Sequence, residues 1–167
     1  MTQRVELATV LDRLAVDGLI TEYAVALDDG DWRAYRELFT PDARADYRSA
    51  GGIEGDVDQV ADWLARSTGL LAVRQHLVVN RRVRFGVLEQ DTGDTAHVQA
   101  DYVSPLRFAS PDGTPDPPHP AADTAPDLLC GGRYAFTLLR TEDGWRLREV
   151  VLHEKWRRTA DGRPVPS

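Results

Sequence analysis

The spacing of apolar residues in this chain changes once, near residue 70, from a helical period to one typical of strands. This change constrains the fold more than any other feature of the sequence. Before that point, apolar residues recur at three- and four-residue steps, as on one face of a helix. The first such stripe consists of Val16, Leu19, Ile20, Tyr23, Ala24 and Leu27. After that point, segments rich in Val, Leu and Phe predict strands. Helices first and strands afterwards predict an α+β fold.

Three helices are expected before the change in period. They cover Val5–Asp29, Trp32–Phe39, and a third segment that ends at about Ser67. Gly30 is a C-terminal stop for the first helix, and Asp31 can cap the second. Asp56 with Gln59 three residues later resembles a capping box at the start of the third helix. An extended segment, residues 43–49, is expected between the second and third helices.

The second part of the chain predicts a meander of four antiparallel strands. They cover Val73–Leu88, Thr95–Phe108, Gly131–Arg140 and Trp145–Trp156, with turns at "EQDTGD" and "TEDG". Six of the ten prolines lie in a stretch at about residues 109–129, which predicts a stiff surface loop. N-terminal helices packed on a strongly curved antiparallel sheet would form a cone-shaped α+β barrel, and the wide end of such a cone commonly holds a small-molecule cavity.

The bulk properties limit the possible classes of function. At 167 residues, the whole chain (1–167) fits one domain, and its single cysteine, Cys130, cannot form an intramolecular disulfide. A net charge of −7 with mixed signs argues against nucleic acid or a membrane surface as a partner. The start of the sequence lacks a signal-peptide pattern, and no run approaches the ~20 apolar residues of a membrane span. We therefore expect a cytoplasmic protein.

Four scattered residues carry the candidate chemistry. Tyr23 and Asp28 belong to the first predicted helix, Tyr47 to the extended segment, and His76 to the predicted strand "RQHLVVN". An Asp beside a His can orient and tune a proton-transfer group. If these side chains meet in one cavity, the sequence predicts an enzyme that moves protons.

Each of these residues also has a purely structural interpretation. Asp28 can be a solvated acid at a frayed helix end, a lone strand histidine is more often structural than catalytic, and both tyrosines can be core residues. Asn80, on the predicted face of His76, favours a cavity, because an apolar core face needs no amide. The sequence lacks a phosphate-binding loop, a serine nucleophile elbow and metal-ligand spacing, so no metal or cofactor is expected.

Longer motifs indicate a family. The opening "LDRLAVDGLITEYAVALDDGDWRAYRELFTPDARADY" combines an apolar helix, a Tyr with Asp five residues later, "GDW" and "LFTPDA". The later segments "QHLVVN", "DTAHVQADYV" and "GGRYAFTLLRTEDGWRL" follow a matching strand pattern. Together they resemble the nuclear-transport-factor-2-like superfamily, in its SnoaL-like and scytalone dehydratase-like branch. The resemblance runs from about Leu11 to Trp156, without the proline-rich loop.

The resemblance implies specific roles. Dehydratases and dehydrochlorinases of this branch use an Asp–His pair, which corresponds to Asp28 and His76, and the dehydratases add two tyrosines, matched by Tyr23 and Tyr47. The spacings are most similar to those of bile acid 7α-dehydratase. Asp101 falls near a further polar cavity position. The expected cavity arginine of the last strand is replaced by Val150, and Arg148 or Lys155 could substitute only with a change of register.

The sequence therefore predicts a cofactor-independent, dehydratase-type lyase that abstracts a proton α to a carbonyl of a small hydrophobic substrate. His76, Asp28, Tyr23 and Tyr47 are the expected catalytic residues, and Asn80, Asp101 and Arg148 the expected substrate-binding residues. Two alternatives stay open: an isomerase or cyclase of a polyketide-like or steroid-like substrate, and a non-catalytic ligand-binding domain or structural subunit. A homodimer or homotrimer is expected, with Arg82, Arg84, Phe108 and Trp156 as candidate contact residues.

Overall fold

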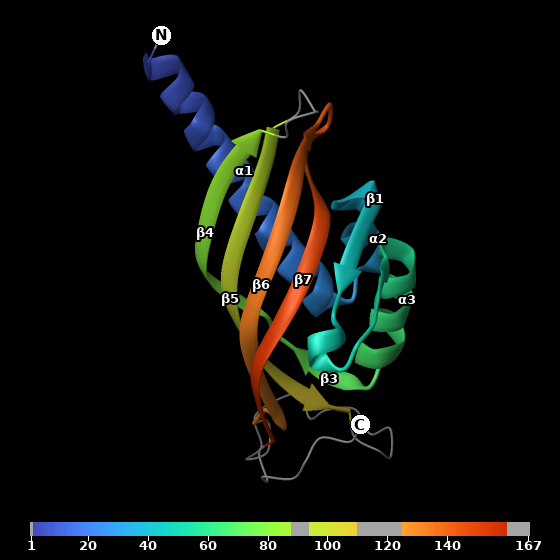
Figure 1. The fold of residues 1–167 in the computed structure, drawn as a ribbon. Coiled ribbons are helices and arrows are strands. Elements are labelled where there is room, and N and C mark those ends of the chain that lie inside the picture. Colours follow the sequence, from blue (N-terminus) through green and yellow to red (C-terminus); the bar gives the residue numbers. More distant parts are fainter. Residues whose placement is uncertain (1, 88–93, 110–124, 160–167) are drawn as a thin grey trace.

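Helices on one face of a strongly curved sheet make up the computed structural model, which describes residues 2–87, 94–109 and 125–159 (Figure 1). Within these residues the helices are α1 (Thr2–Asp29), α2 (Trp32–Glu37), α3 (Val57–Thr68) and a short 3₁₀ turn (Arg48–Ala50). The strands are β1 (Phe39–Asp46), β2 (Glu54–Asp56), β3 (Leu71–Arg74), β4 (Leu77–Val87), β5 (Asp94–Phe108), β6 (Leu128–Thr141) and β7 (Gly144–Thr159). The predicted α+β class is confirmed, and residues 110–124 of the predicted proline-rich loop lie outside the described residues.

Helix α1 crosses the concave face of the sheet and extends past its upper edge (Figure 1). Its C-terminal half contributes Val16, Ile20 and Tyr23 to the core, where all three are fully buried. The N-terminal half carries an exposed apolar stripe at Leu7, Val10, Leu11 and Leu14. Helix α1 is therefore a core element in its second half only.

The sheet is mixed, with strand order β2-β1-β7-β6-β5-β3 and with β4 also paired to β5. Strands β4 to β7 form the predicted antiparallel meander. Strand β1, however, runs parallel to β7, which corrects the expectation of a wholly antiparallel sheet. Because β1 and β7 are far apart in the sequence, no hairpin turn fixes their relative direction.

The predicted long strand Val73–Leu88 is also wrong in one respect, because it is broken in two at Gln75–His76. The backbone N–H of His76 donates to Asp28 Oδ2 at 2.9 Å, and the carbonyl of Gln75 accepts from the Ser104 hydroxyl at 3.0 Å. The side chains of Asp28 and Ser104 thus form hydrogen bonds with backbone groups that would otherwise pair with a neighbouring strand. His76 lies at the junction of β3 and β4, not in the middle of a strand.

Two bulges change which face the neighbouring side chains occupy. In β4 the register shifts between Val79 and Arg82, and Asn80 has a left-handed backbone with φ of 53°. Between β6 and β7, Gly131 pairs with Trp156 while Gly132 pairs with Glu154, so one residue of β7 is extra. After such a bulge the alternation of faces is reversed.

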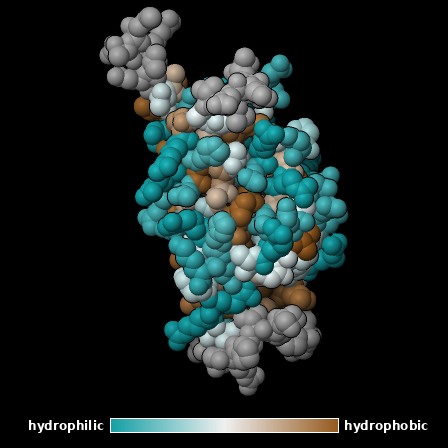
Figure 2. Space-filling view, in the orientation of Figure 1, coloured by the Kyte–Doolittle hydropathy of each residue, from teal (hydrophilic) through white to brown (hydrophobic). Residues whose placement is uncertain are grey.

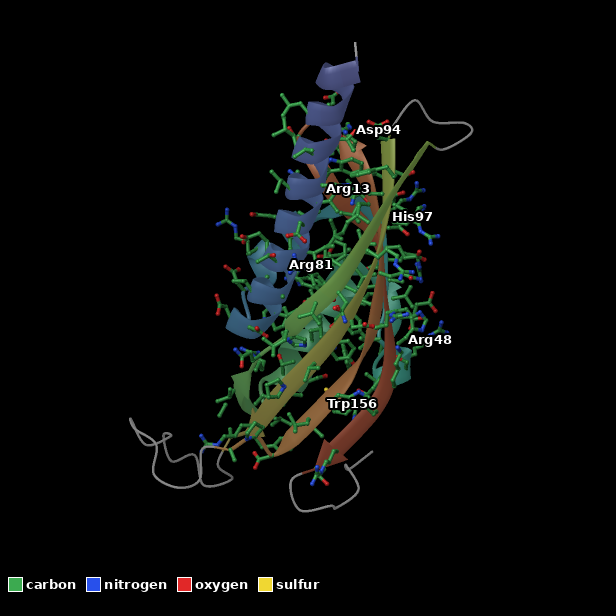
Figure 3. All side chains as sticks on the ribbon, turned by 90° about the vertical axis from the view of Figure 1, so that its left-hand side faces the viewer. Arg13, Arg48, Arg81, Asp94, His97 and Trp156 are labelled. Carbon is green, nitrogen blue, oxygen red and sulfur yellow. The ribbon has the colours of Figure 1, made fainter. Side chains whose placement is uncertain are left out.

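The face of the sheet away from α1 carries mostly hydrophilic residues with apolar residues between them (Figure 2). His97 lies on this outer face, whereas Arg81 reaches across to α1 on the other side (Figure 3). There Arg81 Nη1 donates to Asp17 Oδ1 at 2.7 Å and thereby ties β4 to the helix. The cavity described next lies on the helix-covered face.

Candidate active site

A cavity of about 150 Å³ lies between the C-terminal end of α1, helix α3 and the concave face of the sheet. Most of its wall is apolar, with a few polar side chains among them. The lining residues are Leu27, Tyr47, Ala50, Trp63, Leu64, Thr68, Leu71, Arg74, His76, Tyr102, Ser104, Leu106, Leu128, Cys130, Tyr134, Leu152, Glu154 and Arg157. An apolar pocket with a few convergent polar groups is typical of small-molecule sites.

The structure brings Asp28 and His76 together at this cavity. Asp28 Oδ1 lies 2.6 Å from His76 Nδ1, and Oδ2 accepts the backbone N–H of His76. The two side chains are only 23% and 18% exposed, respectively. One carboxylate thus fixes both the backbone and the ring of the histidine. With Nδ1–H donating to Asp28, the neutral ring presents an unprotonated Nε2 that can accept a proton.

Arg74 joins the end of α1 to α3 and β3 next to this pair. Its Nε donates to the Asp28 carbonyl at 3.2 Å, and its Nη1 donates to the Thr68 hydroxyl at 2.8 Å. The carbonyls of the last helical turn lack intrahelical partners, so a guanidinium stabilises this end. Gly30 follows with φ of 67°, and a Cβ there would lie 2.8 Å from the Arg74 guanidinium. Arg74 therefore helps to position Asp28 by binding the backbone carbonyl of Asp28.

Tyr23 and Tyr47 also meet, with their hydroxyls hydrogen-bonded to each other. The Tyr35 hydroxyl lies 3.3 Å from that of Tyr47. Tyr47 lines the cavity, whereas Tyr23 lies behind it in the core. Burial raises the pKa of both Tyr23 and Tyr47 well above the usual tyrosine value. Both phenols are therefore neutral near pH 7 and suited to donate hydrogen bonds, not to act as bases.

A second polar group occupies the β7 side of the cavity. Arg157 Nε and Nη2 contact the two carboxylate oxygens of Glu154 at 2.9 and 3.0 Å, a two-pronged pairing. Arg157 Nη2 also donates to the Ala50 carbonyl at 3.0 Å. Nearby, burial raises the pKa of the Cys130 thiol to about 11. Tyr102 completes this group with a buried hydroxyl.

The three predicted substrate-binding residues do not line this cavity. Asn80 Nδ2 donates to Asp101 Oδ2 at 3.2 Å, and Arg133 Nε donates to Asp101 Oδ1 at 2.8 Å. Asp101 alternates with the inward-facing Tyr102, so it points to the outer face of β5. Arg148 lies 3.4 Å from Asp42, at a separate surface position. All three are thus separated from His76 by the sheet or by distance along it.

Sequence reasoning missed most of the polar cavity residues, among them Arg74, Tyr102, Glu154 and Arg157. The cavity arginine of the last strand is Arg157, neither Arg148 nor Lys155. It points inward because the bulge at residues 154–156 reverses the alternation of β7. The Gly131–Gly132 pair was the available signal, since adjacent glycines inside a strand often mark a bulge.

No group of His, Cys, Asp or Glu side chains in the described residues has an arrangement that would hold a metal ion. Among the helices of residues 2–87, 94–109 and 125–159, none has the length and apolar character needed to cross a membrane.

Residues 8–151 match the family described as the SnoaL-like domain. The chain belongs to this family. An uncharacterized protein of Mycobacterium tuberculosis is 33% identical over 140 residues, which cover 84% of this chain and 83% of the relative. A protein of Mycobacterium bovis, also uncharacterized, matches over the same shares with the same identity.

Solved structures share the fold of this SnoaL-like protein. A protein of Novosphingobium aromaticivorans, provisionally named a scytalone dehydratase, superposes with a TM-score of 0.71 at 16% identity, over 100% of this chain and 95% of the other. A hexachlorocyclohexane dehydrochlorinase of type 2 superposes with a TM-score of 0.66 at 12% identity, over 97% of both chains. A Kribbella flavida protein reaches 0.65 at 23% identity, over 92% and 97%. The predicted fold is thereby confirmed, and the match to the SnoaL-like family confirms the predicted SnoaL-like resemblance.

Proposed function

We propose that this protein is a cofactor-independent lyase of the dehydratase type, acting on a small, largely apolar carbonyl compound with a β-hydroxyl. The 2.6 Å contact between Asp28 and His76 at the wall of an apolar cavity carries this proposal. A histidine with one nitrogen held by a carboxylate and the other free is a suitable general base.

In the proposed reaction, His76 Nε2 removes the proton α to the substrate carbonyl. Asp28 holds the Nδ1–H and stabilises the imidazolium that forms. The electron pair of the broken C–H bond passes into an enolate, then forms the C=C bond as the β C–O bond breaks. The Nε2–H proton joins the departing hydroxyl to give water, so no oxidant or reductant is needed. The Tyr47 hydroxyl, supported by Tyr23, stabilises the enolate oxygen.

Two fold relatives support elimination as the reaction class. One is provisionally named a dehydratase and the other a dehydrochlorinase, and both names denote loss of a small molecule across a carbon–carbon bond. Such a reaction needs a positioned base and an apolar cavity. The contact between Asp28 and His76 and the apolar lining supply these two requirements here.

The test is turnover of one-ring β-hydroxy ketones, beginning with 3-hydroxy-1-phenylpropan-1-one, with loss of water followed by mass spectrometry. We expect His76→Ala and Asp28→Asn to lower kcat about 10²- to 10⁴-fold, because a positioned general base contributes that much. His97→Ala is the matched control, since His97 lies on the outer face of the sheet. Unchanged turnover in both dyad variants would rule out the proposed role of the pair.

The same dyad can begin an isomerisation or cyclisation, since all three reactions start by removing an α-proton. A product with the mass of the substrate would identify that second candidate function. A purely ligand-binding role is less well supported, because a carboxylate in contact with both the ring and the backbone of His76 is more than apolar binding requires.

A further inference from the structure

One buried polar atom in the cavity has no hydrogen-bond partner within the part of the chain that the structure describes. Tyr102 is only 3% exposed and lines the cavity, and its hydroxyl makes no hydrogen bond to the described residues. Buried polar side-chain atoms are paired in the large majority of cases, and an unpaired one destabilises the protein. An unpaired hydroxyl at the wall of a cavity is therefore available to a ligand.

We infer that the Tyr102 hydroxyl is a substrate-binding group that donates a hydrogen bond to an oxygen of the ligand, and that this ligand is about the size of one six-membered ring. The inference rests on the proposed function for the location of the reacting atoms. It adds a residue outside the predicted set and a limit on the substrate.

The ring of Tyr102 is held in place by its neighbours. Its centroid lies 4.9 Å from that of Tyr134, which in turn stacks on Phe136 at 5.3 Å. Backbone pairing with Val78 on one side and Gly132 on the other fixes the strand position of Tyr102 between β4 and β6. A fixed ring presents its hydroxyl at a defined position, which lowers the entropy lost on binding.

The other hydroxyls of the cavity wall already have partners, including those of Thr68, Ser104 and Tyr134. Tyr47 contacts both Tyr23 and Tyr35 through its hydroxyl, so a ligand oxygen there competes with existing partners. The Glu154 carboxylate is likewise occupied by the two-pronged contact with Arg157. A ligand oxygen in the bound ground state therefore gains most at Tyr102, whereas the role proposed for Tyr47 concerns the enolate charge that develops during the reaction. Burial also raises the pKa of Tyr102, which keeps the phenol neutral and able to donate.

The cavity volume sets the size of the ligand. The cavity has a mostly apolar wall, and its volume of about 150 Å³ is similar to that of an apolar cavity known to bind benzene. A monocyclic carbonyl compound matches this volume. A fused four-ring skeleton is larger than this volume and would have to extend out of the pocket.

Binding of acetophenone and ethylbenzene tests this inference, because the two molecules have similar shapes and differ in the carbonyl. In titration calorimetry we expect Tyr102→Phe to weaken acetophenone binding about 2- to 10-fold and to leave ethylbenzene binding unchanged, as for loss of one neutral hydrogen bond. The melting temperature of Tyr102→Phe should stay the same or rise, because the deleted hydroxyl has no partner in the free protein. Tyr35→Phe deletes the same atom from a paired core tyrosine and should lower the melting temperature without changing the preference between the probes.

The inference would be overturned by equal acetophenone affinity in wild type and Tyr102→Phe, by loss of affinity only in Tyr47→Phe, or by no binding of either probe to the wild type. A fall in the melting temperature of Tyr102→Phe as large as that of Tyr35→Phe would also overturn it. Acetophenone has no β-hydroxyl to eliminate, so these measurements are independent of turnover. Failure of the proposed dyad chemistry would instead appear in the kinetics of the His76 and Asp28 variants.

Discussion

At the scale of single residues, burial determines the protonation of most groups around the cavity. The phenols of Tyr23, Tyr47 and Tyr134 all have raised pKa values, first because they are buried and then because they lie close to one another. Burial also raises the pKa of the Cys130 thiol to about 11. The cavity wall is therefore uncharged over a wide pH range, apart from Arg74, the Glu154–Arg157 pair and the Asp28–His76 pair.

These shifts predict a loss of stability at alkaline pH. A thiol whose pKa rises from 9.0 to about 11 on folding favours the folded state fully below pH 9, and this contribution disappears as pH rises through 11. The buried phenols act in the same direction above pH 10. We expect the melting temperature to be constant from pH 7 to about 8.5 and to fall above about pH 9, with the fall starting later in Cys130→Ser. A flat profile up to pH 11 would contradict this prediction.

At the scale of secondary-structure elements, helix α3 forms one wall of the cavity through Trp63, Leu64 and Thr68. Its N-terminus has the predicted capping box: the Asp56 side chain accepts from Gln59 N at 2.9 Å, and Gln59 Oε1 accepts from Asp56 N at 3.2 Å. These two contacts satisfy backbone N–H groups that the helix leaves unpaired. The start of α3 is thus determined locally, before any tertiary contact.

Asp56→Ala should lower the free energy of unfolding by about 1 kcal/mol, because it removes the N-cap acceptor. Asp56→Asn is the matched control and should cost only a few tenths of that amount, since Asn is an equally good N-cap. Chemical denaturation monitored by circular dichroism would measure both. Equal losses in the two variants would show that the charge, not the cap, stabilises this helix.

At the scale of the whole molecule, the outer face of the sheet carries an apolar row across four strands. Leu77 pairs with Val103, Val103 with Gly131, and Gly131 with Trp156, so these residues lie side by side from β4 to β7. The Trp156 indole lies over Gly131, where a Cβ would come within 2.3 Å of it. Leu77, Val103 and Trp156 are exposed. A contiguous exposed apolar row is typical of a contact surface.

We therefore expect the chain to form a homo-oligomer through this row, with Val103→Glu shifting the mass measured by light scattering to that of a monomer. A buried carboxylate without a partner would oppose association there. Ser67→Glu adds the same charge on α3, away from the outer face, and should leave the mass unchanged. A monomeric wild type, or an unchanged mass for Val103→Glu, would contradict the predicted interface.

Much of the fold was predictable because its signals are local. The apolar stripe of α1, the capping box of α3 and the turn between β6 and β7 each depend on residues close together in the sequence. The parallel pairing of β1 with β7 was not predictable in this way, because it joins elements about 100 residues apart. The break between β3 and β4 was missed for the same reason, since Asp28 causes it from another element.

The sequence by itself determined the order of helices and strands, the family, and the pairing of Asp28 with His76 as a candidate dyad. Tertiary structure decided which other polar side chains share a cavity with that dyad. Asn80, Asp101 and Arg148 face elsewhere, while Arg157 points inward because the bulge at residues 154–156 reverses the alternation of β7 at that point. Successive side chains of a strand point to opposite faces of the sheet, so one extra residue moves the side chains that follow it to the other face. Whether a strand can hold such an extra residue depends on the opposing strand. The bulge thereby decides which residues contact the ligand.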